Sequence, residues 1–269
     1  MPAVTAIVPR PFGTENSVAL AHRLSAAAFS QDLFERVAAA RAGVTGPLVF
    51  TTSFGLEDQA IGHAILSQNL DIDLVTLDTG RLFSETHDVW AETERRYGRR
   101  IHAIVPERSA LEALIDAQGA NGFRASVAAR QACCHVRKVE PLNRALAGAQ
   151  GWVTGLRADQ SQHRAEVSFA SVDTARGLIK INPLFDWTRE RAVDFTQKHN
   201  VPINTLHAGG FLSIGCAPCT RAVQPGEPER AGRWWWEDEG KNECGLHANP
   251  LHLAARRAAE ESALESAQS

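Results

Sequence analysis

Hydrophobic positions along the chain alternate between two kinds of spacing. Between residues 18 and 42 they recur at the spacing of one helix face, which predicts an amphipathic helix. Residues 47–53 (PLVFTTS) begin with a short apolar run and are a candidate buried strand. The same alternation continues, with strand-like runs and helix-spaced segments in turn, at residues 57–68 (helix), 71–79 (strand), 84–98 (helix) and 101–106 (strand).

This succession of strands and helices predicts an α/β fold. Strands that are apolar throughout belong to parallel sheets that helices cover on both faces, and such sheets bind ligands beyond the carboxyl ends of their strands. Residues 53–58 and 78–86 follow two of the predicted strands and are therefore candidate ligand-binding loops. Beyond residue 108 the alternation weakens, and the pattern predicts helices over 130–148 and 188–200 and short strands over 152–155 and 177–183.

The last quarter of the chain has a different character. From residue 206 to residue 247 it is rich in Gly, Pro, Cys and Trp and has little periodicity, which indicates a long functional segment. We therefore divide the chain into an α/β domain at 1–205 and a C-terminal segment at 206–269. The final twenty residues or so have good helix propensity but a weak apolar face.

Composition and charge exclude several classes of protein. The 269 residues are 44% hydrophobic and 22% charged, close to globular averages. No apolar run approaches the roughly 20 residues of a membrane span, and the N-terminus lacks a secretory pattern, so we expect a cytoplasmic protein with no membrane partner. A net charge of −3 argues against a general nucleic-acid binder and means that an anionic ligand needs a local cluster of cations.

Cysteines supply the strongest chemical signal. There are five of them, an odd number in a chain without an export signal, which favours metal or catalytic chemistry over disulfides. The adjacent Cys133 and Cys134, with the Cys-x-x-Cys pair Cys216 and Cys219, would give four thiolates to zinc or to an iron–sulfur cluster. Spacing leaves the metal open, although neighbouring cysteines are atypical of zinc sites, and buried free thiols remain the alternative. Cys244, in a polar stretch with cationic neighbours, is a candidate nucleophile or an accidental exposed thiol.

Two glycine-containing motifs and two arginine-rich ones complete the candidate chemistry. SFGLED (53–58) and DTGRLFSET (78–86) each follow a predicted strand, so together they favour a nucleotide-sized crevice, although each alone is explained by a capped turn. SFGLED lacks the Gly-Lys-Ser/Thr ending of a phosphate-binding Walker loop. GLRADQSQHR (155–164) and ERAGRWWW (229–236) supply enough arginines to hold a sulfate or phosphate, although each arginine alone is typical of a protein surface.

In their order along the chain, SFGLED, DTGRLFSET, CCHVRK, GLRADQSQHR, CAPCT, ERAGRWWW and ECGLH resemble the iron–sulfur type of assimilatory adenylyl-sulfate reductase, a branch of the phosphoadenylyl-sulfate reductase family. The resemblance spans about residues 47–247. It implies an adenine nucleotide α-hydrolase-like fold of the ATP-pyrophosphatase type, a parallel twisted sheet flanked by helices, with a mobile C-terminal tail. The domain at 1–205 would then bind nucleotide and include Cys133 and Cys134, and the segment at 206–269 would hold the second cysteine pair and the catalytic tail.

The implied activity is the reduction of adenosine 5′-phosphosulfate (APS) to sulfite and AMP through an enzyme S-sulfocysteine. Thioredoxin, or glutaredoxin, would supply the electrons, and the reaction would serve assimilatory sulfate reduction and cysteine biosynthesis. The resemblance assigns a [4Fe–4S] cluster to Cys133, Cys134, Cys216 and Cys219, and catalytic roles to Cys244, His247, Lys138, Arg230 and Arg233. It assigns substrate binding to Ser53, Phe54, Gly55, Glu57, Asp58, Asp78, Thr79, Gly80, Arg81, Leu82, Arg157 and Arg164.

Three other functions stay open at this point. The nearest is reduction of the 3′-phosphorylated nucleotide, or of both nucleotides. A metal-bearing adenine-nucleotide sensor is a second reading, but such a sensor has no need of Cys244. An ATP-dependent adenylating enzyme is a third, but SFGLED lacks the serine- and glycine-rich pyrophosphate loop such enzymes need. The oligomeric state is also open, a homo-oligomer included.

Overall fold

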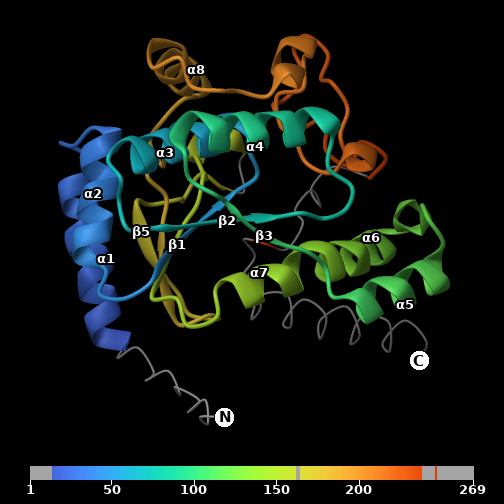
Figure 1. Cartoon of the computed structure of the whole chain (residues 1–269), viewed down its shortest axis with the longest axis horizontal. Helices are drawn as coiled ribbons and strands as arrows, with labels where there is room; N and C mark the ends of the chain where they lie inside the picture. Colours follow the sequence, from blue (N-terminus) through green and yellow to red (C-terminus); the bar gives the residue numbers. More distant parts are fainter. Residues whose placement is uncertain (1–13, 162–163, 238–245, 247–269) are drawn as a thin grey trace, which may run out of the picture.

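The computed structural model describes residues 14–161, 164–237 and 246, and its centre is a six-stranded sheet (Figure 1). The strands lie in the order β3-β2-β1-β4-β6-β5. All neighbours are parallel except β5 and β6, which pair antiparallel at one edge. Their bounds are β1 (Leu48–Thr52), β2 (Asp73–Leu77), β3 (His102–Ile104), β4 (Gly151–Val153), β5 (Ala170–Asp173) and β6 (Leu178–Ile181). The predicted α/β fold with a parallel sheet is confirmed, and the antiparallel edge strand β5 is an addition.

Helices cover both faces of the sheet (Figure 1). The larger hydrophobic cluster lies on one face and joins α1 (Thr14–Ala28), α2 (Leu33–Gly43), α3 (Leu56–Ser67), α4 (Ser84–Tyr97) and α8 (Arg189–Lys198) to the strands. The smaller one joins α7 (Glu140–Ala145) to the opposite face. Because successive strand side chains point to opposite faces, Leu48 and Phe50 belong to the first cluster and Val49 to the second. None of the described helices is long and apolar enough to cross a membrane.

Two segments that were each predicted to form one continuous helix are divided in the structure. The segment at 18–42 forms two helices, because α1 ends at Ala28 and Asp32 starts the second helix with a capping box. Its carboxylate accepts the N–H of Glu35 at 2.9 Å, and the Glu35 carboxylate accepts the N–H of Asp32 at 2.8 Å. The segment at 130–148 is also divided, into α6 (Val127–Cys134), a π-helical turn (His135–Val139) and α7. The helix α5 (Arg108–Gln118) has no buried residues and was not predicted.

Short turns make up the described part of the C-terminal segment. It contains the 3-10 turns Thr205–Gly209 and Ala217–Cys219 and a single bridge between Thr220 and Arg233. Two further 3-10 turns, Gly122–Arg124 and Ala158–Gln160, lie earlier in the chain. The weak periodicity after residue 206 is consistent with this, while the division of the chain at residue 205 stays a prediction.

We expect Asp32→Ala to lower the free energy of unfolding by about 1 kcal/mol, because the first turn of α2 loses its cap. Urea unfolding measures the change. Ser30→Ala is the matched control, because the exposed Ser30 hydroxyl donates only to the carbonyl of Ala27. Equal effects of the two substitutions would contradict the capping account.

Candidate active site at the carboxyl edge of the sheet

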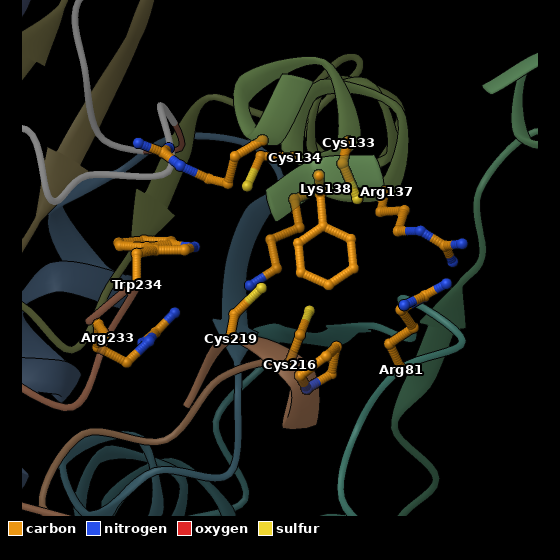
Figure 2. Close-up of a pocket in the computed structure, with 12 residues that line it drawn as sticks. Arg81, Cys133, Cys134, Arg137, Lys138, Cys216, Cys219, Arg233 and Trp234 are labelled. Carbon is orange, nitrogen blue, oxygen red and sulfur yellow. The ribbon is translucent and has the colours of Figure 1, made fainter. Parts of the chain in front are cut away.

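The two cysteine pairs, far apart in sequence, line one cavity (Figure 2). Cys133 and Cys134 end α6. Cys216 precedes the turn Ala217–Cys219, and Cys219 ends it. All four are free thiols, three of them buried and Cys133 half-buried. The remaining lining residues are Arg81, Phe123, Arg130, Arg137, Lys138, Pro218, Arg233 and Trp234.

Local backbone structure brings the thiols to this cavity. The side chain of Ser126 caps α6 by accepting the N–H of Ala129 at 3.1 Å. Adjacent residues of a regular helix point well apart, but a π-helical turn follows Cys134 directly, a distortion that is frequent at functional sites. On the other side, the N–H of Cys219 donates to the carbonyl of Cys216 at 2.9 Å and closes the second turn.

The loop after β2 holds the Cys-x-x-Cys turn in place. The N–H of Ala217 donates to the carbonyl of Arg81 at 2.8 Å, and the Thr79 hydroxyl lies 3.3 Å from Cys216 Sγ. Thr79 and Arg81 therefore lie beside the cysteine cavity, although the resemblance assigned them to the nucleotide. Arg81 donates to the carbonyl of Ala120 and lies over the Phe123 ring, 5.3 Å from its centroid.

Cations around the cavity oppose the effect of burial on the thiols. Burial alone would raise the pKa of Cys216, but Lys138, the Thr79 hydroxyl and Arg233 together hold that pKa below its usual range. Burial and the neighbouring Cys216 raise the pKa of Cys219 to about 11. The cavity is thus electropositive, yet its thiols differ in how readily they ionise.

Three buried donors around the cavity bear on what it can hold. Within the described residues, Arg137 Nε, Arg233 Nε and Trp234 Nε1 have no hydrogen-bond partner, although all three side chains line the cavity. Buried donors are normally satisfied, so these three indicate an acceptor-rich occupant. Sulfide and thiolate sulfurs of an iron–sulfur cluster accept such bonds.

The arrangement of the thiols also bears on the kind of group. Four thiolates on a single zinc ion, with bonds of about 2.3 Å, would hold their sulfurs roughly 3.8 Å apart around one point. In the described part of the chain, no three His, Cys, Asp or Glu side chains converge on one ion in this way. Four thiols that line one cavity, together with three unsatisfied donors among its other lining residues, suit a multinuclear group.

The predicted ligand-binding loop at 53–58 follows β1 and is held in shape by its own residue Asp58. Asp58 Oδ2 accepts from the N–H of Ser53 at 2.6 Å and from its hydroxyl at 2.7 Å. Phe54 has a positive φ of 57° and is buried, stacked on Trp90 with ring centroids 5.6 Å apart. Gly55 then begins α3 without a side-chain cap, which leaves N–H groups of the first turn for an anion.

The β4 loop packs directly on this loop. Gly155 follows β4, and a Cβ there would clash with the carboxylate of Asp58. Burial, together with the neighbouring Glu57 carboxylate, raises the pKa of Asp58 to about 6 despite the hydrogen bonds from Ser53. Arg157 points inward and pairs with Glu57, Asp159 and Glu229.

Most of the remaining predicted site residues are described by the structure, and two of them are not. Asp78 accepts the N–H of Gly80 at 2.9 Å, and Gly80 has a φ of 67°, which favours glycine. Leu82 and Arg164 are half-buried, and Arg164 donates to Gln160. Arg230 lies in a turn, and its carbonyl accepts the N–H of Arg233 at 2.9 Å.

Cys244 and His247 lie outside the described residues. Leu246, between them, is described and packs on the smaller hydrophobic cluster.

Several residues at the site were missed from the sequence. Arg130 and Arg137 line the cavity, and each is four residues from a cysteine, Cys134 and Cys133 respectively, so helical spacing could have identified them. Glu229 and Trp234 have no such local signal. Trp234 is fully buried between Arg130 and Arg233, whose guanidinium carbons lie 4.6 and 4.7 Å from its ring centroid.

Asp58→Asn removes a carboxyl that titrates near neutrality. The pKa of about 6 exceeds the ordinary value of 3.8, so the folded state binds this proton more tightly than the unfolded state. Ionised Asp58 therefore destabilises the fold, and the penalty disappears as the pH falls through 6. From about pH 7 to about pH 5, wild type should gain about 1 kcal/mol of unfolding free energy relative to the variant in urea titrations. A difference that does not change with pH would refute the raised pKa.

Comparison with known proteins agrees with this geometry. The model of the phosphoadenosine phosphosulfate reductase domain matches residues 47–222. Proteins named adenosine 5′-phosphosulfate reductase from Agrobacterium fabrum and Allochromatium vinosum are 56% and 52% identical over 77% and 74% of this chain, covering 79% and 78% of their own lengths. A crystal structure of phosphoadenylyl-sulfate reductase from Candida auris, a phosphate complex, has a TM-score of 0.63 and 26% identity, over 76% of this chain and 96% of that one. The resemblance seen in the sequence is confirmed, and the chain belongs to the phosphoadenosine phosphosulfate reductase family.

Proposed function

We propose that the protein reduces APS to sulfite and AMP with electrons from thioredoxin. The observation that supports this most is the shared cavity of Cys133, Cys134, Cys216 and Cys219, next to a nucleotide-type loop at the same edge of the sheet. The relatives named adenosine 5′-phosphosulfate reductase support the same substrate.

The nucleotide would lie across the carboxyl ends of β1 and β2, where the loops 53–58 and 78–82 meet. N–H groups at the start of α3 suit a phosphate. Lys138, Arg164, Arg230 and Arg233 would surround the phosphosulfate, with His247. Their positive charge would stabilise the leaving phosphate more in the transition state than in the ground state.

The first chemical step is attack of the Cys244 thiolate on the sulfate sulfur. A sulfur–sulfur bond forms, the bond from sulfur to the phosphate oxygen breaks, and AMP leaves with the electron pair. The product is an S-sulfocysteine at Cys244. A thioredoxin thiolate then attacks the Cys244 sulfur and expels sulfite, and the second thioredoxin thiol reduces the mixed disulfide. The two thioredoxin thiols thus supply both electrons, and Cys244 must become accessible between the steps.

The four cavity cysteines would hold a [4Fe–4S] cluster, with Arg137, Arg233 and Trp234 donating to its sulfurs. When bound, the cluster would supply a compact, redox-capable charge beside Lys138 and Arg233. The four cysteines would bind it, and the cations would balance its charge. Neither chemical step above needs electrons from the cluster.

Such an enzyme belongs to assimilatory sulfate reduction and supplies sulfite for cysteine biosynthesis. A cytoplasmic location suits it, because free thiols and reduced thioredoxin persist there. The phosphoadenylyl-sulfate reductase from Candida auris makes the 3′-phosphorylated nucleotide the second candidate substrate.

We expect protein purified without oxygen to contain iron and to form sulfite from APS, with reduced thioredoxin, faster than from the 3′-phosphorylated nucleotide. Cys244→Ser should lower sulfite release at least about a thousandfold, because the nucleophile is gone, while iron content and AMP affinity stay unchanged. Cys133→Ser is the matched cysteine variant and should lose iron instead. A fully active Cys244→Ser protein would refute the assigned nucleophile.

A further inference from the structure

The guanidinium of Arg157 is buried and bonded to three carboxylates. Its side chain is 0% exposed. Nε lies 2.8 Å from Glu57 Oε1, Nη1 lies 3.1 Å from Asp159 Oδ2, and Nη2 lies 2.7 Å from Glu229 Oε2. Glu57 and Glu229 are themselves only 13% and 15% exposed, whereas Asp159 is 56% exposed. The two strong contacts of Arg157 are therefore those to Glu57 and Glu229.

These two carboxylates come from distant parts of the chain. Glu57 lies in the first turn of α3, directly after the loop that follows β1. Arg157 follows β4, which is the parallel neighbour of β1, so the two strands end at the same edge. Glu229 belongs to the C-terminal segment. Arg157 is thus the bridge from the nucleotide loop to that segment.

Glu229 is the second residue of the turn that leads to Arg230 and Arg233. The N–H of Ala231 donates to the carbonyl of Pro228, and the N–H of Arg233 donates to the carbonyl of Arg230, both at 2.9 Å. Arg233 then reaches the cysteine cavity. A fixed Glu229 consequently fixes where this turn places Arg230 and Arg233 relative to the nucleotide loop.

Charge balance argues against a direct contact between Arg157 and an anionic substrate. Arg157 faces three carboxylates, and Glu229 is shared with Arg189, whose Nη1 lies 3.8 Å from Glu229 Oε1. Three negative charges therefore meet two positive ones, so the surroundings of Arg157 are net negative. Burial raises the pKa of Glu229, as does the Glu57 carboxylate, and Arg157 opposes this shift. Without Arg157, the two half-buried carboxylates would repel each other and the bridge would open.

We infer that Arg157 is a positioning residue: it sets the distance between the nucleotide loop and the turn of Arg230 and Arg233 by bridging Glu57 and Glu229, and it does not bind the phosphosulfate. The inference rests on the proposed function only for the direction of its kinetic effect. It replaces the substrate-binding role that the sequence resemblance assigned to Arg157.

The test is a double-mutant cycle in the iron-loaded full chain, with Arg157→Met, Glu229→Gln and the pair. Arg157→Met should lower kcat/KM for APS at least about tenfold. If Arg157 acts through Glu229, the effect of Glu229→Gln should be much smaller in the Arg157→Met background than alone. Independent, multiplying effects would overturn the inference and favour a direct substrate contact.

The pH profile gives a readout that a general loss of structure would not move. Arg189 faces Glu229 at 3.8 Å, and His207 and Asp58 face Glu57; all three stay in place in the variant. In Arg157→Met, protonation of Glu229 or Glu57 should relieve their repulsion, so the ratio of variant to wild-type kcat/KM should rise as the pH is lowered. The pair with Glu229→Gln should not show this rise. A ratio that is flat with pH in Arg157→Met would contradict the bridge.

Two further variants keep the test decisive. Arg221→Met removes an arginine of the same segment that pairs with Glu227 at 2.7 Å, away from the nucleotide loop, and should change kcat/KM less than about threefold. Arg157→Lys keeps the positive charge but cannot donate to Glu57 and Glu229 at the same time as the guanidinium does. It replaces Arg157→Met in the cycle if that variant does not fold. It should still lower kcat/KM, with the same dependence on Glu229.

AMP binding separates this inference from the proposed function. If wild type formed no sulfite from either nucleotide, the proposed function would fail, and calorimetric AMP affinities in the same cycle would still measure the coupling of Arg157 to Glu229. Additive effects on AMP affinity would then overturn the bridge.

Discussion

Four thiols can share one buried cavity only if nearby donors and cations balance the charge they carry as thiolates. Here Arg137, Lys138 and Arg233 supply that balance, and much of the surrounding backbone serves to place them. The π-helical turn after Cys134 carries Arg137 and Lys138, which line the cavity with the cysteines. Trp234 lines it too and has a left-handed φ of 45°. Strain of this kind persists only where the surroundings enforce it, and it concentrates at functional sites.

The parallel sheet explains why a cavity of cysteines and a nucleotide loop lie close together. Parallel strands release their loops at one edge, so the ends of β1, β2 and β4 meet there. Thr79 contacts Cys216 from the β2 loop, and Arg157 reaches Glu57 from the β4 loop. The C-terminal segment has little regular structure of its own and depends on these contacts, through Glu229 and through the Cys-x-x-Cys turn. These contacts connect the nucleotide loop and the cysteine cavity to the same edge of the sheet.

Much of this could be predicted from the sequence, and the exceptions have physical causes. Buried strands and helix-spaced segments showed the sheet and most of its helices. β5 lies at a half-exposed edge and leaves little hydrophobic signal. α5 buries no residue, but Leu111, Leu114 and Ile115 are spaced as on one helix face, so this helix could have been predicted. The cysteines could be predicted as site residues because cysteine is scarce in this chain and four of the five lie in two closely spaced pairs. The partners of Arg157 could not be found, because Glu57 and Glu229 are 100 and 72 residues away and ion pairs between loops leave no local pattern.

The proposed function places a multinuclear iron–sulfur group in the four-cysteine cavity. Anomalous diffraction at the iron absorption edge, from crystals of protein purified without oxygen, tests it most directly. We expect a strong iron peak between Cys133, Cys134, Cys216 and Cys219, and about four irons and four sulfides per chain in the same protein. A single peak at the zinc edge, or no anomalous peak in this cavity, would contradict it.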